Sequence, residues 1–144
     1  MWRVATPLLL NFLVQGWMGE VNYRAIPTGA VPTPPSYVFA VVWTVLYLLL
    51  GGVLYRTRSP TLLALWTFNM LINLSWTYVV FVRQNVVGGI YLIVSMMGST
   101  LAFAFLTDDK WSRGMLVPYL TWLMVALILN VEMARASAKN LKKI

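Results

Sequence analysis

An apolar run that follows two consecutive prolines most constrains what this chain can fold into. After Pro34 and Pro35, an apolar run of about 17 residues follows, roughly the length that crosses the hydrocarbon core of a bilayer. Proline suits the start of a helix, where its missing N–H would be unpaired anyway. Phe39, Trp43 and Tyr47 recur every four residues and predict an aromatic stripe on one helix face, which suits either a helical neighbour or a flat ligand.

Composition extends this interpretation to the whole chain. Of the 144 residues, 60% are hydrophobic and 10% are charged, whereas about a quarter of the residues of a soluble domain are charged. A single polytopic membrane domain is therefore predicted. The net charge of +7 is spread over short loops and a tail, which favours membrane orientation and contact with anionic lipid headgroups over nucleic acid as a partner. Histidine and cysteine are both missing, so no metal site and no required cofactor are expected.

Five apolar segments predict an all-α integral membrane protein, an up-and-down bundle of five transmembrane helices over residues 1–144. Their limits are about 4–19, 36–55, 62–82, 86–106 and 115–134. Short connections after the second segment imply that successive helices are antiparallel and adjacent. The connection 20–35 is the exception, because it is long and contains four prolines. We interpret it as a lid over one end of the bundle.

Charge predicts the orientation. Five spans place the two termini on opposite sides of the membrane, and the basic residues are divided almost evenly between the two sides. Four of them cluster after the fifth segment, at Arg135, Lys139, Lys142 and Lys143. Because cytoplasmic segments carry an excess of Lys and Arg, a cytosolic C-terminus and a cytosolic first loop are predicted. The host membrane stays open.

Amide and aromatic side chains recur at helical spacing inside the spans. The third segment contains Trp66, Asn69, Asn73 and Trp76, and the fifth contains Pro118, Tyr119, Trp122, Ala126 and Asn130. An amide in hydrocarbon is costly unless it is paired, so these faces should point inward. The tryptophans within spans are Trp43, Trp66, Trp76 and Trp122, whereas Trp2, Trp17 and Trp111 suit the membrane interface. Helix packing and a pocket for a flat hydrophobic molecule with polar edges both explain this pattern.

Three groups of residues form a more specific signature across the second to fifth segments. They are Pro34-Pro35-x-Tyr37-Val38-Phe39 with Val42-Trp43-Thr44-x-Leu46-Tyr47, then Asn73-Leu74-x-Trp76 with Phe81-x-Arg83-Gln84, and Val117-Pro118-Tyr119-Leu120-x-Trp122 with Ala126-x-x-Leu129-Asn130. This set resembles the translocator protein family (TspO/MBR), also known as tryptophan-rich sensory proteins. The chain departs from the family pattern at Pro32, where a tryptophan usually precedes the proline pair. The segment 129–135 also lacks the central tyrosine of a sterol-recognition pattern.

The resemblance implies a five-helix bundle, commonly a dimer, that binds tetrapyrroles such as protoporphyrin IX, and sterols in some members. It also implies a ligand pocket under the first loop, formed by Trp43, Asn73, Tyr119, Trp122 and Ala126. Some members are described as degrading porphyrin in light, a chemistry that the resemblance connects with Trp43 and Trp122.

We therefore expect a membrane receptor for a tetrapyrrole or another flat hydrophobic ligand, with a sterol or lipid as a further candidate. The predicted ligand-binding residues are Phe39, Trp43, Tyr47, Asn73, Trp76, Tyr119, Trp122, Ala126 and Asn130. Arg24 and Arg83 are candidates for contact with porphyrin carboxylates, whose geometry arginine matches. The alternatives are a light-dependent porphyrin-degrading enzyme, and a small transporter or structural membrane partner. Small-residue spacing permits a homodimer. No catalytic residues are assigned, because no triad, phosphate loop or carboxylate pair occurs in the sequence.

Overall fold

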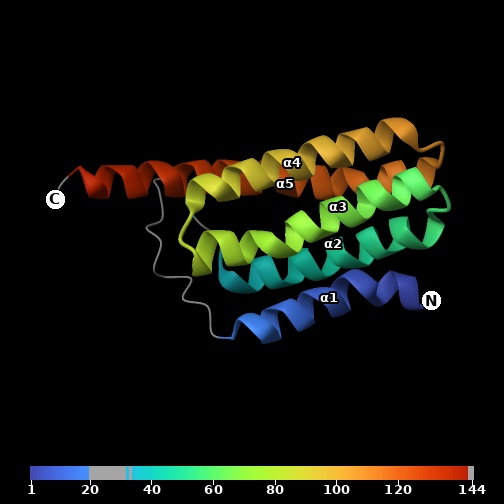
Figure 1. Ribbon diagram of the computed structural model, residues 1–144, viewed down its shortest axis with the longest axis horizontal. Helices are drawn as coiled ribbons and strands as arrows, with labels where there is room; N and C mark the ends of the chain where they lie inside the picture. Colours follow the sequence, from blue (N-terminus) through green and yellow to red (C-terminus); the bar gives the residue numbers. More distant parts are fainter. Residues whose placement is uncertain (20–31, 33, 143–144) are drawn as a thin grey trace.

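Five helices form an antiparallel bundle in the part of the chain that the computed structural model describes, residues 1–19, 32 and 34–142 (Figure 1). They are α1 (Trp2–Met18), α2 (Ser36–Arg56), α3 (Pro60–Thr77), α4 (Val86–Leu106) and α5 (Lys110–Leu141), with a π-helical segment, η1 (Tyr78–Val82), continuing α3. The region from α2 to α5 provides four spans long and apolar enough to cross a membrane, and α1 is shorter, at 17 residues. Most of the predicted lid, together with Arg24, lies outside the described residues.

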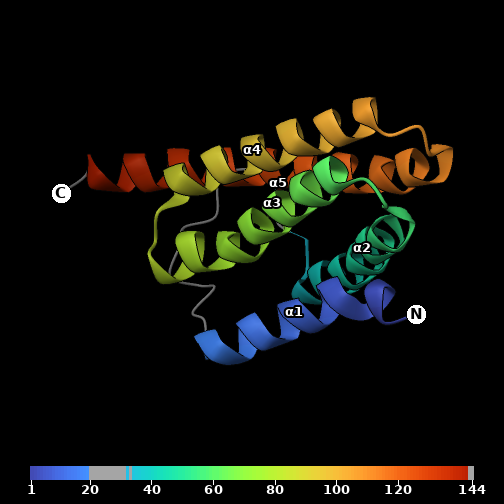
Figure 2. The ribbon, with the colours of Figure 1, turned by 45° about the vertical axis from the view of Figure 1, so that its right-hand side comes forward.

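The helices are packed in a ring whose order differs from the order of the chain. Helix α2 packs closely against α1 and α5, α4 packs against both α3 and α5, and α1 also contacts α3 (Figure 2). Successive helices are therefore adjacent as predicted, except that α2 and α3 are not a closely packed pair in the described part of the chain. The bulky indole of Trp66 on α3 reaches across to α2, where its Nε1 donates to the Leu50 carbonyl at 3.0 Å.

Side-chain caps explain where three of the helices begin. The Ser59 side chain accepts from the Leu62 N–H before Pro60 starts α3, and Asn85 Oδ1 accepts from the Gly88 N–H at 2.8 Å to start α4. Asp109 caps α5, so this helix starts at Lys110 rather than near the predicted residue 115. It also continues past the predicted end at residue 134, because no proline or glycine interrupts residues 135–141.

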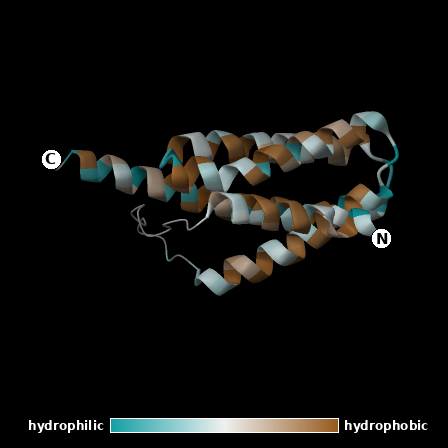
Figure 3. Ribbon diagram, turned by 60° about the horizontal axis from the view of Figure 1, so that its bottom comes forward, coloured by the Kyte–Doolittle hydropathy of each residue, from teal (hydrophilic) through white to brown (hydrophobic). Residues whose placement is uncertain are grey.

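Hydrophobic residues recur along all the spans, and hydrophilic residues gather at the end where the α2–α3 and α4–α5 turns lie (Figure 3). Large side chains such as Phe12, Phe68 and Phe105 are exposed on the spans, as a lipid environment requires. The interface tryptophans Trp2, Trp17 and Trp111 are exposed too, as expected. Of the tryptophans predicted inside spans, Trp66 is buried, and Trp43, Trp76 and Trp122 are partly buried against the core.

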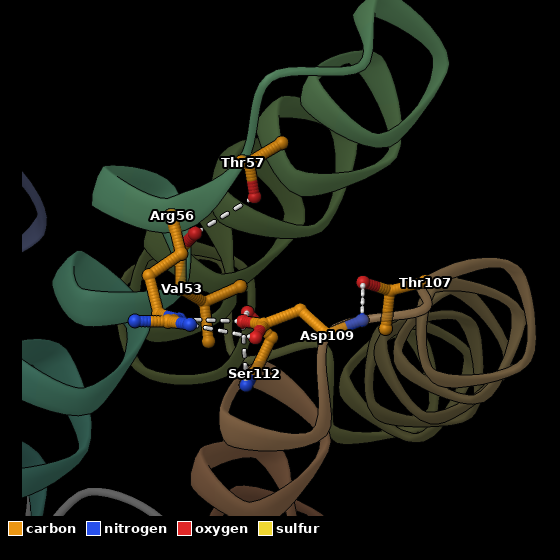
Figure 4. Close-up of polar contacts among 6 residues, drawn as sticks. All are labelled: Val53, Arg56, Thr57, Thr107, Asp109 and Ser112. Atoms are coloured by element: carbon orange, nitrogen blue, oxygen red, sulfur yellow. Dashed lines mark hydrogen bonds and ion pairs between the residues drawn. The ribbon is translucent and has the colours of Figure 1, made fainter.

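One end of the bundle is closed by a polar cluster around Asp109 (Figure 4). Arg56 at the end of α2 donates through Nε to Asp109 Oδ2 at 2.6 Å and through a terminal nitrogen to Oδ1 at 2.8 Å. Asp109 Oδ2 also accepts from the Ser112 N–H at 3.0 Å and from its hydroxyl at 2.6 Å. These contacts with Arg56 and then Ser112 hold the pKa of the Asp109 carboxyl well below its usual range.

Candidate functional site

A continuous set of hydrogen bonds crosses the centre of the bundle. The Tyr47 hydroxyl of α2 donates to Asn73 Oδ1 of α3 at 2.8 Å, with Asn11 Oδ1 of α1 as a second acceptor at 3.3 Å. Asn73 Nδ2 donates to the Tyr119 hydroxyl of α5 at 3.1 Å, and that hydroxyl donates to Asn69 Oδ1 at 2.8 Å. Two tyrosines and three amides therefore link four helices without a charged group.

Helix α4 completes this central network through Asn69. The Asn69 Nδ2 atom lies 2.9 Å from the Met96 carbonyl, 2.7 Å from Ser99 Oγ and 2.9 Å from Thr100 Oγ1. All five helices thus contribute a partner. Pairing offsets the desolvation cost that an isolated amide in hydrocarbon would carry. A cavity of about 10 Å³ beside Asn69 is at the lower limit for holding one water molecule.

A second polar layer lies near the start of α4. Trp76 Nε1 donates to Asn130 Oδ1 at 3.1 Å, and Asn130 Nδ2 donates to the Val86 carbonyl at 2.6 Å. Asn130 is fully buried. Gly89 makes room for it, because a Cβ at that position would lie 2.8 Å from Asn130 Oδ1. This layer ties α3, α4 and α5 together and is built without contributions from the central network.

Aromatic rings form a third group between α2 and α5. The rings of Phe39 and Trp122 meet edge to face with centroids 5.5 Å apart. Trp43 stacks on Tyr47 at 5.4 Å and so rests on the central network. The Trp122 Nε1 atom is buried, and it has no hydrogen-bond partner among the described residues. A buried donor without a partner costs about 1–3 kcal/mol, so this N–H calls for an explanation.

A groove of about 520 Å³ runs beside Trp122 between α2 and α5. Its lining residues are Val41, Val42, Val45, Leu46, Val117, Pro118, Thr121, Trp122 and Val125. The Thr121 hydroxyl is engaged with the Val117 carbonyl at 3.0 Å, so the rest of the lining presents mainly apolar groups. The volume falls within the range of about 300–1,000 Å³ that is common for small-molecule sites.

The structure distributes the predicted binding residues over these three groups. Trp122 lines the α2–α5 groove, Phe39 packs against Trp122, and Trp43 stacks on Tyr47. Tyr47, Asn73 and Tyr119 belong to the central network, and Trp76 and Asn130 form the second layer. Ala126 is half-buried against the core. Arg83 is exposed at the end of η1.

The predicted site set omits two members of the central network. Asn11 and Asn69 both lie at inward-facing helical spacing, one of them a single turn before Asn73. The spacing of each residue within its own helix indicates that its side chain points toward the interior of the bundle. Their shared partners are tyrosine hydroxyls on other helices, and spacing within one helix cannot identify such partners.

The fold and this interior define a class of protein: a five-helix integral membrane protein whose interior polar contacts are made by amides, tyrosines and tryptophans. Comparison of the sequence with protein families makes the assignment specific. The TspO/MBR family model matches residues 4–135, and the chain belongs to this family.

Similar proteins come from distant organisms. Protein CrtK from Rhodobacter capsulatus is 31% identical over 112 residues, which cover 71% of this chain and 70% of that protein. The tryptophan-rich protein TspO of Archaeoglobus fulgidus is 29% identical over 105 residues, covering 68% of this chain and 69% of the relative. Translocator protein 2 of Mus musculus is 26% identical over 147 residues, covering 93% and 91%.

Proposed function

We propose that this protein is a membrane receptor that binds a tetrapyrrole such as protoporphyrin IX, or another flat hydrophobic ligand, between α2 and α5. The observation that carries the proposal is Trp122, which lines an apolar groove and whose buried N–H has no acceptor among the described residues. A ligand with a carbonyl, carboxylate or ring-nitrogen acceptor would pair this donor and fill the groove at once.

The neighbouring rings support a flat ligand. Phe39 of α2 packs edge to face against the groove residue Trp122, and Trp43 stacks on Tyr47 one turn along the same helix, so several aromatic rings lie close to one another beside Trp122. The groove lies on the outside of two membrane-spanning helices, so a hydrophobic ligand could reach it from the bilayer. Arg83 holds no ion pair among the described residues and stays a candidate for contact with a ligand carboxylate.

Replacement of Trp122 by phenylalanine tests the proposal. The Trp122→Phe variant keeps an aromatic ring against Phe39 but loses the N–H. We expect protoporphyrin IX to bind about tenfold more weakly, which corresponds to about 1.4 kcal/mol. The measurement is a titration of the purified protein in detergent, followed by tryptophan quenching and, independently, by the shift of the porphyrin absorbance band.

Trp111→Phe is the matched control, because Trp111 is exposed at the opposite end of the bundle. Its affinity should equal that of the parent protein. Equal affinity of the Trp122→Phe, Trp111→Phe and parent proteins would contradict the proposal. Illuminating the same complexes separates a receptor from a light-dependent enzyme, since an enzyme would destroy the porphyrin absorbance in light faster than the porphyrin bleaches without protein, and would leave it intact in darkness.

A further inference from the structure

Helix α5 continues well beyond the bundle. Its 32 residues extend for about 48 Å at 1.5 Å per residue, whereas the hydrocarbon core of a bilayer is about 30 Å thick. Among the described residues, the last contacts with the bundle are made by Asn130, which bonds to Val86, and by Met133 and Ala134, which pack against the Val80 and Val86 pair. The remainder of the helix projects past the other helices (Figure 1).

Cations line one face of this projecting part. Arg135, Lys139 and Lys142 follow one another at steps of four and three residues, which places them within an arc of about 60° around the helix. All three are exposed. Arg135 is paired with Glu132 at 2.6 Å, and neither lysine holds an ion pair in the part of the chain that the structure describes. The face that Arg135, Lys139 and Lys142 form is called the basic face below.

Two cations at the opposite end of the bundle are committed to the protein itself. Arg56 binds Asp109 in the polar cluster, and Arg113 donates to the carbonyls of Ala104 and Thr107 at the end of α4. Arg58 and Lys110 at that end are exposed and hold no ion pair among the described residues, but they lie in the α2–α3 connection and at the start of α5, and not along one helix face. The lysines of the basic face are available to an external anion and are aligned along one side of a single helix.

We propose that the basic face binds the headgroups of anionic phospholipids in the adjacent leaflet. Its residues lie within about 12 Å of the last bundle contact along the helix axis. Charges in physiological salt attract each other over about 8–10 Å, so cations this close to the end of the spans can interact with lipid headgroups beside the bundle. Basic residues clustered next to a transmembrane helix attract anionic lipid at such distances, and the sequence supplies a further cation at Lys143.

A label on the extension tests the proposal. The chain contains no cysteine, so Asn140→Cys provides a single site, away from the basic face, for an environment-sensitive fluorophore. The protein is placed in nanodiscs of phosphatidylcholine with increasing fractions of phosphatidylglycerol that carries a headgroup quencher. We expect quenching to rise with the phosphatidylglycerol fraction more steeply than random mixing of the two lipids around the protein would give. We also expect it to fall when sodium chloride is added.

Two double variants show whether the lipid is attracted by the basic face or by the overall positive charge of the protein. Lys139→Gln with Lys142→Gln should reduce the apparent affinity for phosphatidylglycerol at least fivefold, while Arg58→Gln with Lys110→Gln, the matched pair of exposed cations at the opposite end, should leave it unchanged. The proposal is overturned if both pairs respond alike or if the quenching is indifferent to lipid charge. It is overturned as well if inorganic phosphate at equal ionic strength displaces the lipid better than sodium chloride does. Circular dichroism confirms that each variant keeps its helical content.

Discussion

At the scale of single residues, the polar side chains inside the spans act mainly as shared partners. Asn73 accepts a hydrogen bond from Tyr47 with one end of its amide and donates to Tyr119 with the other. It therefore joins α2, α3 and α5 through two atoms. Asn69 joins α4 and α5 in the same way, because it donates to the Met96 carbonyl and accepts from the Tyr119 hydroxyl. Each amide satisfies its own hydrogen-bonding groups by satisfying those of a neighbour, as is required away from water.

The first prediction concerns Asn73. Asn73→Leu has a similar volume but removes one hydrogen-bond partner from each of two buried tyrosine hydroxyls, so the free energy of unfolding should fall by about 1–3 kcal/mol. Ser75→Ala is the control, because its exposed hydroxyl bonds only to the Leu71 carbonyl of its own helix. Unfolding in mixed micelles with increasing sodium dodecyl sulfate, followed by circular dichroism, measures both. Equal stability of the two variants would show that the network carries little of the bundle's stability.

The second prediction concerns pH. The pKa of Asp109 is lowered in the folded protein by Arg56 and Ser112, so its charge stabilises the fold at any pH above the ordinary carboxyl value. This contribution is lost as pH falls below about 4 toward the lowered pKa. Asp109→Asn should therefore flatten the decline of the melting temperature below pH 4. Asp108→Asn removes a neighbouring exposed carboxylate with no such contacts and should keep the slope of the parent protein.

At the scale of helices, close backbone approach determines how α1 joins the bundle. A Cβ on Gly51 of α2 would lie 1.9 Å from the Val4 carbonyl oxygen of α1, which no rearrangement of a flexible side chain could relieve. The glycine is needed for packing and not for an unusual backbone conformation. Helix α1 can therefore stay against α2 only while this position has no side chain.

The third prediction follows from this contact. Gly51→Ala should separate α1 from α2 and destabilise the protein by about 1–3 kcal/mol. Gly98→Ala on α4 meets nothing within 4 Å and should be neutral or stabilising by up to about 1 kcal/mol, because alanine favours helix. Thermal denaturation in detergent compares the two. A melting temperature that rises in both variants would mean that the α1–α2 contact adapts without cost.

The elements also show which features the sequence makes predictable. Charge-free runs revealed the middle of each span, and the cap at Asn85 follows from a local pattern. Helix α5 was assigned too short, because hydropathy ends where Arg135 begins, although the helix has no reason to stop there. The ring order and the tyrosine partners of Asn73 depend on contacts between distant segments. Periodicity indicates which face of a helix points inward, but it does not indicate which helix that face meets.

At the scale of the whole molecule, the two ends of the bundle differ in kind. One end is closed by short turns, helix caps and the ion pair between Arg56 and Asp109. The other end carries Arg83 and the basic face of α5, whose lysines project away from the bundle. The interior joins these ends through two separate polar layers, so the molecule is held together along its length without charges in its centre.

The fourth prediction is the orientation. The cluster of cations after Ala134 predicts a cytosolic C-terminus, and labelling of a single cysteine at Asn140 tests it. In intact cells a membrane-impermeant maleimide should leave Asn140→Cys unmodified, and permeabilised cells should be labelled. A single cysteine at Arg58, on the opposite end, should already be labelled in intact cells. Labelling of Asn140→Cys in intact cells would place the basic face outside.

The central network has a consequence for how the protein is made. Synthesis proceeds from the N-terminus, so Asn69 and Asn73 leave the ribosome before Tyr119, the residue that connects them. Helix α4 can bond only Asn69, and α2 only one end of Asn73. A nascent chain that stops after α4 therefore retains open amide groups in the lipid, and the last helix to arrive is the one that completes them.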